Sequence, residues 1–357
     1  MESDDSPKSE KTPSPRYKCS ACYKQYKKAE HLVEHLKLAL HSAHDPRCGV
    51  CRKHCKSLES LREHLAGPKA KEHCMEIFSD QGCDLCLKLF DNPASLSQHR
   101  EWCLLSAPAP IETMIIPNAE SQSFMNLCGE NDFNNHPEAI AVDCEMVGGG
   151  SDGSLDLCAR VCLTDENENV LFNTYVRPQL SITNYRYEIT GLEEGHFRNA
   201  MPLIEVQDKV LEILYNEESI GRSRLDGGKA KLLVGHDLDC MGMYYPEHLL
   251  RDTAKYRPLM KTNRTSHSLT YLTKKYLGYD IQSAVHDPYE DCVAVMRLYK
   301  RFQALDHQTE GTVASLDGSF DSWTTEKFEN MTAEELYALS KPDYKCWCLD
   351  TRQALQP

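Results

Sequence analysis

The stretch that decides the fold of this chain is Ala139-Ile140-Ala141-Val142-Asp143-Cys144-Glu145-Met146, an apolar run interrupted by two carboxylates. In a β-strand, side chains two residues apart point to the same face. We therefore expect Asp143 and Glu145 to project together from one side of a buried strand, where negative charge is unfavourable unless a cation compensates it. The alternative is an edge strand that exposes both acids to water, so the rest of the chain decides between the two.

The second half of the chain, residues 138–305, alternates strand-like and helix-like segments. The expected strands are 139–146, 157–164, 169–176, 231–235 and 249–253, and the expected helices are 202–215, 267–277 and 287–302. Residues 165–168 are expected to close a hairpin, and the glycine-rich residues 221–229 a surface loop. A hairpin followed by helices between later strands predicts a mixed α/β sheet with flanking helices.

The last of these helices begins with His286-Asp287-Pro288-Tyr289-Glu290-Asp291. Asp287 is expected to cap the helix, Pro288 to occupy its first position and Glu290 to complete a capping box. Asp291 then falls at the end of the first turn, and His286 just before the helix. A carboxylate and an imidazole placed in this way can face one site, although each alone is more often a surface group.

The composition shows no sign of export or membrane insertion. Charged residues make up 26% of the 357 residues and hydrophobic residues 41%, which is ordinary for a soluble protein. Residues 1–15 lack the apolar core of a secretory signal and are expected to be disordered, and no apolar stretch is long enough to span a bilayer. Seventeen cysteines in such a chain favour metal ligands in a reducing compartment over a disulfide scaffold.

A cysteine–histidine spacing appears three times between residues 16 and 104. Each copy reads Cys-x2-Cys-x12-His, with a hydrophobic residue four after the second cysteine and a leucine three before the histidine. These are the core positions of a ββα zinc finger, whose helix carries the histidine. Three matching copies predict three structural zinc sites. Their shared ligands are Cys19, Cys22 and His35; Cys48, Cys51 and His64; and Cys83, Cys86 and His99.

The fourth zinc ligands are less uniform. His41 follows in the first finger, with His44 as a competitor, and Cys103 completes the third finger. In the second finger, Cys74 and His73 both lie beyond the usual spacing. We prefer Cys74 there, because a thiolate also completes the third site.

The formal net charge of −14 is distributed unevenly along the chain. Residues 16–73 contain 13 Lys and Arg against 6 Asp and Glu, a net charge of +7, so the first two fingers form a basic region. Their lysines and arginines suit contact with phosphates more than the reading of bases. The fingers are therefore expected to tether nucleic acid, with a folding or protein-docking role as the alternative.

The motifs of the second half together resemble the DEDDh 3′→5′ exonucleases over about residues 138–303. They are most similar to the RNA exonuclease 4 branch, which includes the interferon-stimulated and apoptosis-enhancing nucleases. With the preceding fingers, the chain resembles plant members of this branch. The resemblance implies a ribonuclease H-like fold. The motifs that carry it are Asp-Cys-Glu-Met at 143–146, Ile189-Thr190-Gly191-Leu192, Arg251-Asp252-Thr253 and Tyr289-Glu290-Asp291.

The resemblance also implies a mechanism in which two divalent metal ions clamp the attacking and leaving oxygens of a phosphodiester. Carboxylates suit Mg²⁺ or Mn²⁺. Asp143, Glu145 and Asp291 are expected to bind one ion, with Asp143 bridging to the second. His286 is expected to be the general base that deprotonates the attacking water. The residues expected to contact the terminal nucleotide are Met146, Ile189, Thr190, Gly191 and Leu192.

The second motif departs from the family pattern. In the relatives, the catalytic aspartate comes further after the histidine of a Gly-His pair than it can here, where the chain reads Gly235-His236-Asp237-Leu238-Asp239. Counting back from the downstream match assigns Asp237 as the remaining catalytic and metal-binding acid, with Asp239 as the alternative. About four residues are missing, or roughly 6 Å of helix, so the change removes one turn or displaces the carboxylate.

The sequence therefore favours a metal-dependent 3′→5′ exonuclease that acts on single-stranded RNA, or also on DNA, and whose fingers tether the substrate. The main alternative is a nucleic-acid-binding protein whose nuclease domain is impaired at the second motif. A sequence-specific DNA-binding regulator is a weaker reading, because it gives the α/β domain no role. Residence in the nucleus, including the nucleolus, is expected, with the cytoplasm as the alternative.

Two segments carry no recognised motif. Residues 105–137 are expected to be a linker. Residues 306–357 are expected to be a tail in which Thr332 begins a short helix with a capping box. The tail also contains Cys346, Trp347 and Cys348 in no assignable pattern, so it either packs on the nuclease domain or docks a partner.

Overall fold

A computed structural model gives the architecture of most of the chain. The expected disorder of residues 1–15, most of the expected linker 105–137 and nearly all of the expected loop 221–229 lie outside the described residues. The described residues are 16–68, 70–109, 138–218, 229–304 and 325–352.

The chain divides into two compact units. The first contains Met1–Cys55 and His307–Asp343, and the second contains Lys56–Asp306 and Tyr344–Pro357. The division falls inside the predicted second finger, so two of its expected ligands belong to each unit. The domain boundaries expected from the sequence stay predictions.

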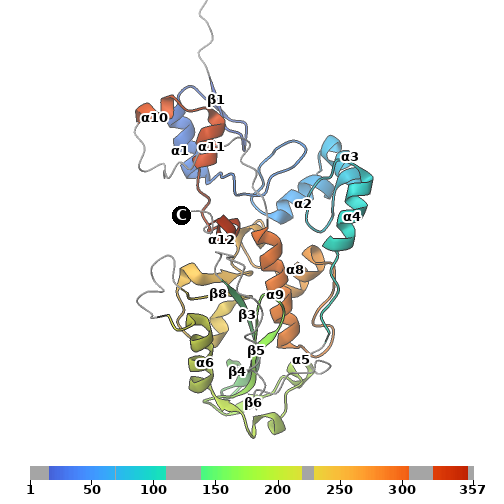
Figure 1. The fold of residues 1–357 in the computed structure, drawn as a ribbon, viewed down its shortest axis with the longest axis vertical. Helices are drawn as coiled ribbons and strands as arrows, with labels where there is room; N and C mark the ends of the chain where they lie inside the picture. Colours follow the sequence, from blue (N-terminus) through green and yellow to red (C-terminus); the bar gives the residue numbers. More distant parts are fainter. Residues whose placement is uncertain (1–15, 69, 110–137, 219–228, 305–324, 353–357) are drawn as a thin grey trace, which may run out of the picture. The chain divides into compact units, whose positions relative to one another are not determined.

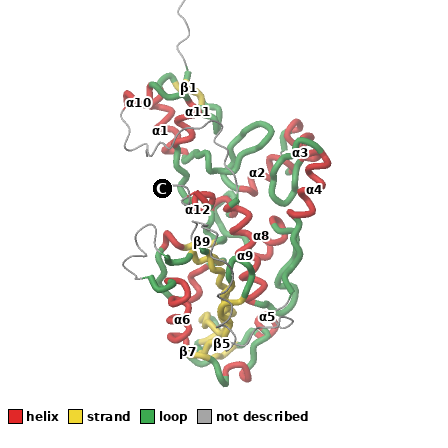
Figure 2. Tube along the Cα trace, viewed as in Figure 1, coloured by secondary structure: helices red, strands yellow, loops and turns green. Residues whose placement is uncertain are grey.

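The second unit is built on one mixed sheet. Across it the strands follow the order β7-β5-β4-β3-β8-β9, with β6 paired to the carboxyl end of β3. Figure 2 shows strands of this sheet in yellow, with β5, β7 and β9 labelled. Strands β3, β4 and β5 are antiparallel neighbours, whereas β8 and β9 run parallel to β3. The predicted mixed α/β sheet is thus confirmed. Its strands are β3 (Ala139–Gly149), β4 (Leu155–Thr164), β5 (Val170–Arg177), β6 (Ile182–Asn184), β7 (Met201–Pro202), β8 (Leu232–Gly235) and β9 (Leu250–Asp252).

Helices cover both faces of this sheet. Figure 1 shows α6 (Leu203–Tyr215) and α9 (Pro288–Gln303) on opposite sides of the strands. Val142 and the alternate residues of β3 pack with the buried stripe of α6 in one apolar core. Because strand side chains alternate between faces, Asp143 and Glu145 project toward α9. The remaining short elements of this sheet domain are α5 (Tyr187–Thr190), η3 (Glu194–Phe197), η4 (Leu238–Met241), η5 (Glu247–Leu249), η6 (Arg257–Leu259) and α8 (Leu269–Tyr276).

The start of α9 agrees with the sequence prediction in two respects and differs in one. Asp287 is the N-cap, its side chain accepting a hydrogen bond from the Tyr289 N–H, and Pro288 is in the first turn. The predicted capping box is wrong, because the Glu290 carboxylate accepts the N–H of Gln282, at 3.1 Å, rather than that of the capping residue. The Glu290 carboxylate is therefore bound by the backbone N–H of Gln282, in the loop before α9, and not by the N–H of Asp287.

The last described residues of the chain pack into the second unit around a buried ion pair. Asp350, in α12 (Cys348–Arg352), accepts hydrogen bonds from Arg251 at 2.6 and 2.7 Å and from the Tyr299 hydroxyl at 3.0 Å. The side chains of Arg251 and Asp350 are 3% and 1% exposed. The Trp347 ring stacks on Tyr256 at a centroid distance of 3.8 Å. This part of the tail packs on the α/β domain, as one of the two sequence hypotheses expected.

Three helices from the finger region belong to the same unit. Arg62 donates to the Lys275 carbonyl at 3.2 Å and lies over the Tyr276 ring. After the third finger, Leu105 donates its N–H to the Leu277 carbonyl at 3.0 Å. These contacts join the finger helices to α8 and its C-terminal end. The helices are α2 (Leu58–Ala66), α3 (Glu72–Gln81) and α4 (Pro93–Cys103).

The first unit contains the first finger, with its hairpin of β1 (Tyr17–Lys18) and β2 (Gln25–Tyr26) and its helix α1 (Ala29–Ala39). Two helices from the other end of the chain complete its core: α10 (Thr325–Glu329) and α11 (Ala333–Leu339). Thr332 caps α11 in the predicted capping box with Glu335.

Apolar contacts and hydrogen bonds fix these tail helices to the finger. Phe328, Leu336 and Tyr337 are buried in one cluster with Leu32 and Leu36 of α1. The Tyr337 hydroxyl donates to the Ser42 carbonyl at 2.7 Å. The first finger is therefore a composite of residues about 300 positions apart in the chain.

Within the described residues, none of the helices combines the length and the apolar character that a crossing of the bilayer needs.

The ion pair between Arg251 and Asp350 gives a test of the tail packing. We expect Asp350→Ala to lower the free energy of unfolding of the second unit by about 3 kcal/mol, because it leaves a buried guanidinium without its carboxylate. The shift of the urea midpoint, followed by tryptophan fluorescence, measures it.

The matched control is Asp280→Ala, which breaks the ion pair with Lys274, whose side chains are 58% and 56% exposed. This change should alter stability by less than about 1 kcal/mol. Equal effects of the two substitutions would show that the Asp350 pair contributes no more than a surface contact.

Candidate active site and zinc sites

Two buried carboxylates face each other between β3 and α9. Burial and the neighbouring Asp291 raise the pKa of Glu145 to about 8, against the opposing effect of Arg160. Burial also raises the pKa of Asp291 to about 7. Their side chains belong to residues that are 5% and 3% exposed. Two acids with raised pKa values on facing elements are typical of a functional site.

The third carboxylate of this face is Asp143. It precedes Glu145 by two residues on β3 and is half-buried. Together with burial, the larger cause, its negative charge raises the pKa of the Cys292 thiol of α9. Cys292 in turn donates a hydrogen bond to the Cys162 carbonyl of β4 at 3.2 Å. The sequence expectation that Asp143 and Glu145 share one face of a buried strand is confirmed, and this face is the one covered by α9.

One oxygen of Asp291 has a partner and the other does not. Oδ2 accepts a hydrogen bond from the Gln282 side-chain amide at 2.7 Å, whereas Oδ1 is buried with no hydrogen-bond partner in the described part of the chain. Buried carboxylate oxygens without partners are unfavourable by several kcal/mol unless a cation or proton compensates them. The residues at this face therefore fit a divalent cation, for which carboxylates are the preferred ligands.

Two residues of this site carried no signal in the sequence. Gln282 has a left-handed backbone, with φ of 58°, and bridges Asp291 and the Glu290 carboxylate. Arg160 of β4 pairs in register with Glu145 and lowers its pKa. Strand alternation alone would have placed a residue opposite Glu145, but it could not have shown that this residue is an arginine facing the site.

His286 lies in the loop before α9 and contacts the segment expected to bind substrate. Its N–H donates to the Ile189 carbonyl at 2.7 Å. Burial lowers the pKa of the half-buried imidazole, so the neutral form predominates at pH 7. A neutral imidazole can accept a proton, which is what a general base requires.

The expected substrate residues have different environments. Ile189 is 48% exposed, whereas Thr190 and Leu192 are buried. The Thr190 hydroxyl donates to the Tyr185 carbonyl and accepts the Leu192 N–H, which fixes the turn. Gly191 has φ of 64°, and a Cβ there would meet Val285 at 2.7 Å, so only glycine lets this turn approach the His286 loop so closely.

Met146 lies on the other face of β3. It follows a register shift after Glu145 and packs against the core shared with α6. Ile189 is thus the one residue of the five whose side chain is plainly exposed in the structure, while the backbone of the turn and Gly191 lie beside it. The substrate roles of all five stay predictions.

The second motif leaves the sheet beside Asp143. Val234 of β8 pairs with Ala141 of β3. The chain after Gly235 therefore emerges next to the part of β3 that carries Asp143 and Glu145. Asp237 then adopts a left-handed conformation, with φ of 60°, at the start of η4, and its side chain is exposed.

The backbone of Asp237 is positioned by Asp252. One oxygen of Asp252 accepts the Asp237 N–H at 3.0 Å and the other accepts the Leu238 N–H at 3.3 Å. The alternative acid, Asp239, pairs with Lys255 at 2.8 Å and its side chain is 81% exposed. Within the described residues, no three carboxylates bring their oxygens within 4.8 Å of one another, and this holds for Asp143, Glu145 and Asp291 as well as for the two acids of the second motif. The role of Asp237 stays a prediction.

The first finger brings its four expected ligands together. Ligand atoms of Cys19, Cys22, His35 and His41 lie within 4.8 Å of one another, so His41 rather than His44 completes the group. Burial, then the neighbouring His54, lowers the pKa of His41 to about 4, which keeps its imidazole neutral. Neutral imidazole and thiolate are the ligand forms that zinc requires.

A chain of hydrogen bonds supports His41 from behind. Its Nδ1 lies 3.2 Å from His54 Nδ1, and His54 Nε2 lies 2.5 Å from the Asp45 carboxylate. This arrangement leaves Nε2 of His41 for the metal. Outer-sphere carboxylates and imidazoles of this kind orient zinc-binding histidines.

The third finger also assembles its expected ligands. Ligand atoms of Cys83, Cys86, His99 and Cys103 lie within 4.8 Å of one another. Asn92 caps its helix α4 by accepting the Ser95 N–H at 2.9 Å. The second finger, with Cys48, Cys51, His64 and Cys74, is divided between the two units, and its zinc site stays a prediction.

Comparison with known proteins agrees with both halves of this description. Residues 140–299 match the family described as Exonuclease, and residues 46–69 match the family described as Zinc-finger of C2H2 type. The predicted resemblance to the exonucleases and the predicted ribonuclease H-like fold class are confirmed.

Several curated proteins are similar to this chain over its second half. Human RNA exonuclease 4 is 31% identical over 223 residues, covering 58% of this chain and 50% of that protein. RNA exonuclease 4 of Aspergillus fumigatus is 36% identical over 168 residues, covering 45% of this chain and 50% of that protein. Mouse interferon-stimulated 20 kDa exonuclease-like 2 is 34% identical over 168 residues, covering 45% of this chain and 43% of that protein. The chain spans about half the length of these relatives.

Solved structures show a weaker similarity. The Neurospora crassa Pan2 catalytic unit matches with a TM-score of 0.37 and 19% identity, covering 46% of this chain and 27% of that one. A Saccharomyces cerevisiae Pan2 module in complex with AAGGAA RNA matches with a TM-score of 0.40 and 21% identity, covering 51% and 31%. Structural similarities with TM-scores this low carry no argument about the fold or the function of this chain.

The assignment of His41 can be tested by metal content. We expect His41→Ala to lose one zinc ion per chain relative to the unmodified protein, because three ligands bind zinc far more weakly than four. The control is His31→Ala, an exposed histidine on α1 of the same finger, which should retain every zinc ion. Native mass spectrometry counts the ions, and equal zinc content in both variants would remove His41 from the site.

The raised pKa values of Glu145 and Asp291 predict a pH dependence of stability. Between about pH 5 and 8 the folded protein retains protons that the unfolded chain releases, so the free energy of unfolding falls as pH rises. Without added Mg²⁺ this loss should be on the order of 3 kcal/mol. Millimolar Mg²⁺ should reduce it, because a cation compensates the ionised carboxylates.

The matched variant is the double substitution Glu145→Gln and Asp291→Asn, which removes both titrating groups while keeping their size. Thermal unfolding from pH 5 to 8 should show a flatter profile for this variant and no effect of Mg²⁺. Identical profiles for the variant and the unmodified protein would contradict the prediction.

Proposed function

Because residues 140–299 match the exonuclease family, we propose that this protein is a metal-dependent 3′→5′ exonuclease that removes nucleotides from the 3′ end of RNA. One observation carries the proposal: Glu145 and Asp291 are buried against each other, and an oxygen of Asp291 has no hydrogen-bond partner. Such a pair is unfavourable as a structural feature alone. It becomes favourable once a divalent cation is bound.

The proposed roles follow from the environment of each side chain. Asp143, Glu145 and Asp291 hold Mg²⁺ or Mn²⁺, which supplies the positive charge that stabilises the attacking and leaving oxygens. Gln282 orients Asp291 through its 2.7 Å hydrogen bond. His286 accepts the proton of the attacking water, since its lowered pKa keeps it neutral at pH 7.

Substrate would be positioned by the turn beside His286. The exposed Ile189 side chain offers an apolar surface to the terminal base, and its carbonyl ties the turn to His286. A base placed on this turn brings its phosphodiester close to the proposed general base. Asp237 would complete the metal ligands through movement of its exposed side chain, and Asp252 would position it.

The fingers are proposed to bind zinc and to tether RNA. Lys27, Lys28 and Lys37 are exposed along the first finger, on and beside α1, where they can contact phosphates. The names of the relatives favour RNA over DNA as substrate. The similarity to RNA exonuclease 4 and the presence of the fingers also lead us to propose that the protein acts in the nucleus.

The second candidate is a nucleic-acid-binding protein without nuclease activity. It is favoured by a specific observation: the shortened second motif leaves the Asp237 side chain exposed at the start of η4. A two-metal site that lacks its fourth carboxylate would bind a cation and still fail to cleave.

A labelled RNA decides between the two. A 5′-labelled single-stranded RNA incubated with the protein and Mg²⁺ or Mn²⁺ should yield a ladder that shortens from the 3′ end by one nucleotide at a time. Asp143→Ala should lower the rate by at least about 1,000-fold, as expected for loss of a metal ligand. Binding without shortening at any metal concentration would establish the second candidate.

The same assay separates the two acids of the second motif. Asp237→Ala should abolish the ladder, whereas Asp239→Ala, which breaks a solvent-exposed pair with Lys255, should leave the rate within about twofold. The reverse result would assign the catalytic role to Asp239.

A further inference from the structure

A short segment after α4 attaches the third finger to the α/β domain. Besides the Leu105 hydrogen bond described above, the Ser106 carbonyl accepts a hydrogen bond from Arg297 of α9 at 2.7 Å. The Leu104 side chain lies against Gly278, where a Cβ would meet it at 2.4 Å, and Gly278 has φ of 96°. Glycine is the residue that permits both this conformation and this close approach. The end of the finger is therefore fixed against the end of α8 and against α9.

The loop between the first two zinc ligands of this finger contacts the same domain. Arg62 of α2 donates a hydrogen bond to the Asp84 carbonyl in this loop. Its other terminal nitrogen donates to the Lys275 carbonyl of α8 at 3.2 Å, so the guanidinium bridges the loop and the α/β domain. Zinc would join this loop to the end of α4. The metal therefore closes a cross-link whose two ends contact α8 and α9.

Arg301, in the last turn of α9, reaches the same zinc site. Its Nη2 donates to the Cys103 carbonyl at 2.5 Å, whereas its Nη1 is buried and has no hydrogen-bond partner in the described part of the chain. No carboxylate of the described residues forms an ion pair with this guanidinium. A buried N–H of a cation is unfavourable without an acceptor. We therefore expect negative charge beside it.

The zinc ligands of the third finger supply negative charge. Three thiolates and one neutral imidazole around Zn²⁺ leave one net negative charge, whereas the two thiolates and two imidazoles of the first finger leave none. The Cys83 thiol raises the pKa of Cys103, and the Arg301 guanidinium opposes this increase. Its positive charge thus acts on the Cys103 sulfur as well as on the carbonyl. The unpartnered N–H and the negatively charged site are complementary.

The charge of the third finger differs from that of the first two. Between Cys83 and Cys103 the chain has two basic residues, Lys88 and Arg100, against three acidic ones. A segment with a net negative charge is poorly suited to contact phosphates. The contacts of this finger with α8 and α9 indicate a different role.

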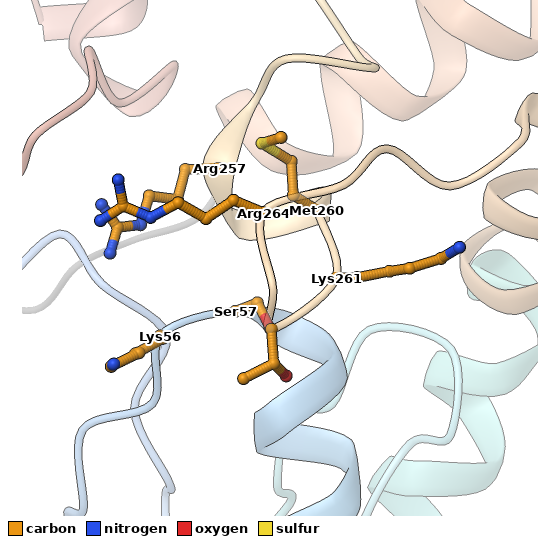
Figure 3. Close-up of a pocket in the computed structure, with 7 residues that line it drawn as sticks. Lys56, Ser57, Arg257, Met260, Lys261 and Arg264 are labelled. Carbon is orange, nitrogen blue, oxygen red and sulfur yellow. The ribbon is translucent and has the colours of Figure 1, made fainter.

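The helix of the second finger is attached at a different place. Glu59, in the first turn of α2, accepts the Thr262 N–H at 3.2 Å, and a pocket lies between the start of α2 and the segment after η6. Figure 3 shows Ser57 at the start of this helix, facing the loop that carries Met260 and Lys261. None of the residues that line the pocket is an expected zinc ligand. This attachment therefore gives a comparison in which no zinc ligand takes part.

We propose that zinc in the third finger stabilises the α/β domain, and that Arg301 couples the two by compensating the charge of the zinc-bound thiolates. Zinc binds the assembled ligands of the folded state, so its binding free energy adds to the stability of whatever holds those ligands in place. Here the ligands are held by α8 and α9, and α9 carries Asp291 in its first turn. The third finger is then a zinc-dependent part of the α/β domain.

Zinc affinity tests the role of Arg301 directly. We expect Arg301→Gln to weaken zinc binding at the third finger about tenfold, a usual effect of losing a residue that contacts a metal ligand. Arg301→Lys, which keeps the charge, should weaken it less. The matched control is Lys300→Gln, because this exposed neighbouring cation donates to the Glu166 carbonyl at 2.5 Å. The control should leave zinc binding unchanged.

A competing chelator removes zinc in steps, and N-ethylmaleimide then labels the thiols that are released. Peptide mass spectrometry identifies the labelled cysteines, so loss from the third finger, with Cys83, Cys86 and Cys103, is distinguished from loss at the other fingers. Release from this finger at the same chelator concentration in Arg301→Gln and Lys300→Gln would overturn the role of Arg301.

Thermal unfolding with saturating zinc tests the coupling. Each substitution is made with and without Cys103→Ser, which disables the zinc site but keeps the carbonyl that Arg301 bonds. Arg301→Gln should lower the Tm by about 4 °C in the protein with Cys103, and by less than half as much with Cys103→Ser. Glu59→Ala, at the attachment without zinc ligands, should lower it equally in both. An equal effect of Arg301→Gln in both would show that Arg301 acts through the carbonyl alone, and the coupling would be rejected.

Hydrogen exchange tests the effect of zinc on the unmodified protein, which also covers a Cys103→Ser variant that does not fold. At the chelator concentration that empties the third finger, backbone amides in the last turn of α9 should exchange at least about tenfold faster. Unchanged exchange there would contradict the stabilisation by zinc. None of these measurements uses RNA, so their outcome does not depend on the proposed function.

Discussion

The burial of Glu145 against Asp291 is the interaction on which the rest of the second unit depends. Two carboxylates with pKa values raised to about 8 and 7 destabilise the interior between β3 and α9 unless protons or a cation compensate them. Arg160 and Gln282 offset part of this destabilisation, one by charge and one by a hydrogen bond. The negative charge that Arg160 and Gln282 leave uncompensated makes the site suited to a divalent cation.

Contacts between distant parts of the chain stabilise both units. In the second unit, Asp350 accepts hydrogen bonds from Arg251 and Tyr299, which connects the end of the chain to β9 and α9. In the first unit, Phe328 and Tyr337 close the core of a zinc finger that is too small to bury its own helix on every side. Tail residues thus take part in the cores of both units.

The proposed catalytic face and the turn proposed to position substrate adjoin each other in the second unit. The catalytic face lies between β3 and α9, and the Ile189 turn adjoins it through the hydrogen bond to His286.

The sequence by itself determined the features that depend on local spacing. The alternation of β3 placed Asp143 and Glu145 on one face, Pro288 marked the start of α9, and the cysteine–histidine spacing identified the ligands that gather in the first and third fingers. Tertiary structure alone decided which groups meet across the fold. Three such contacts join segments whose separation along the chain carries no periodic signal: Gln282 with Asp291, Arg160 with Glu145, and Asp350 with Arg251. Burial and long-range packing produce these contacts, and spacing in the sequence reports neither.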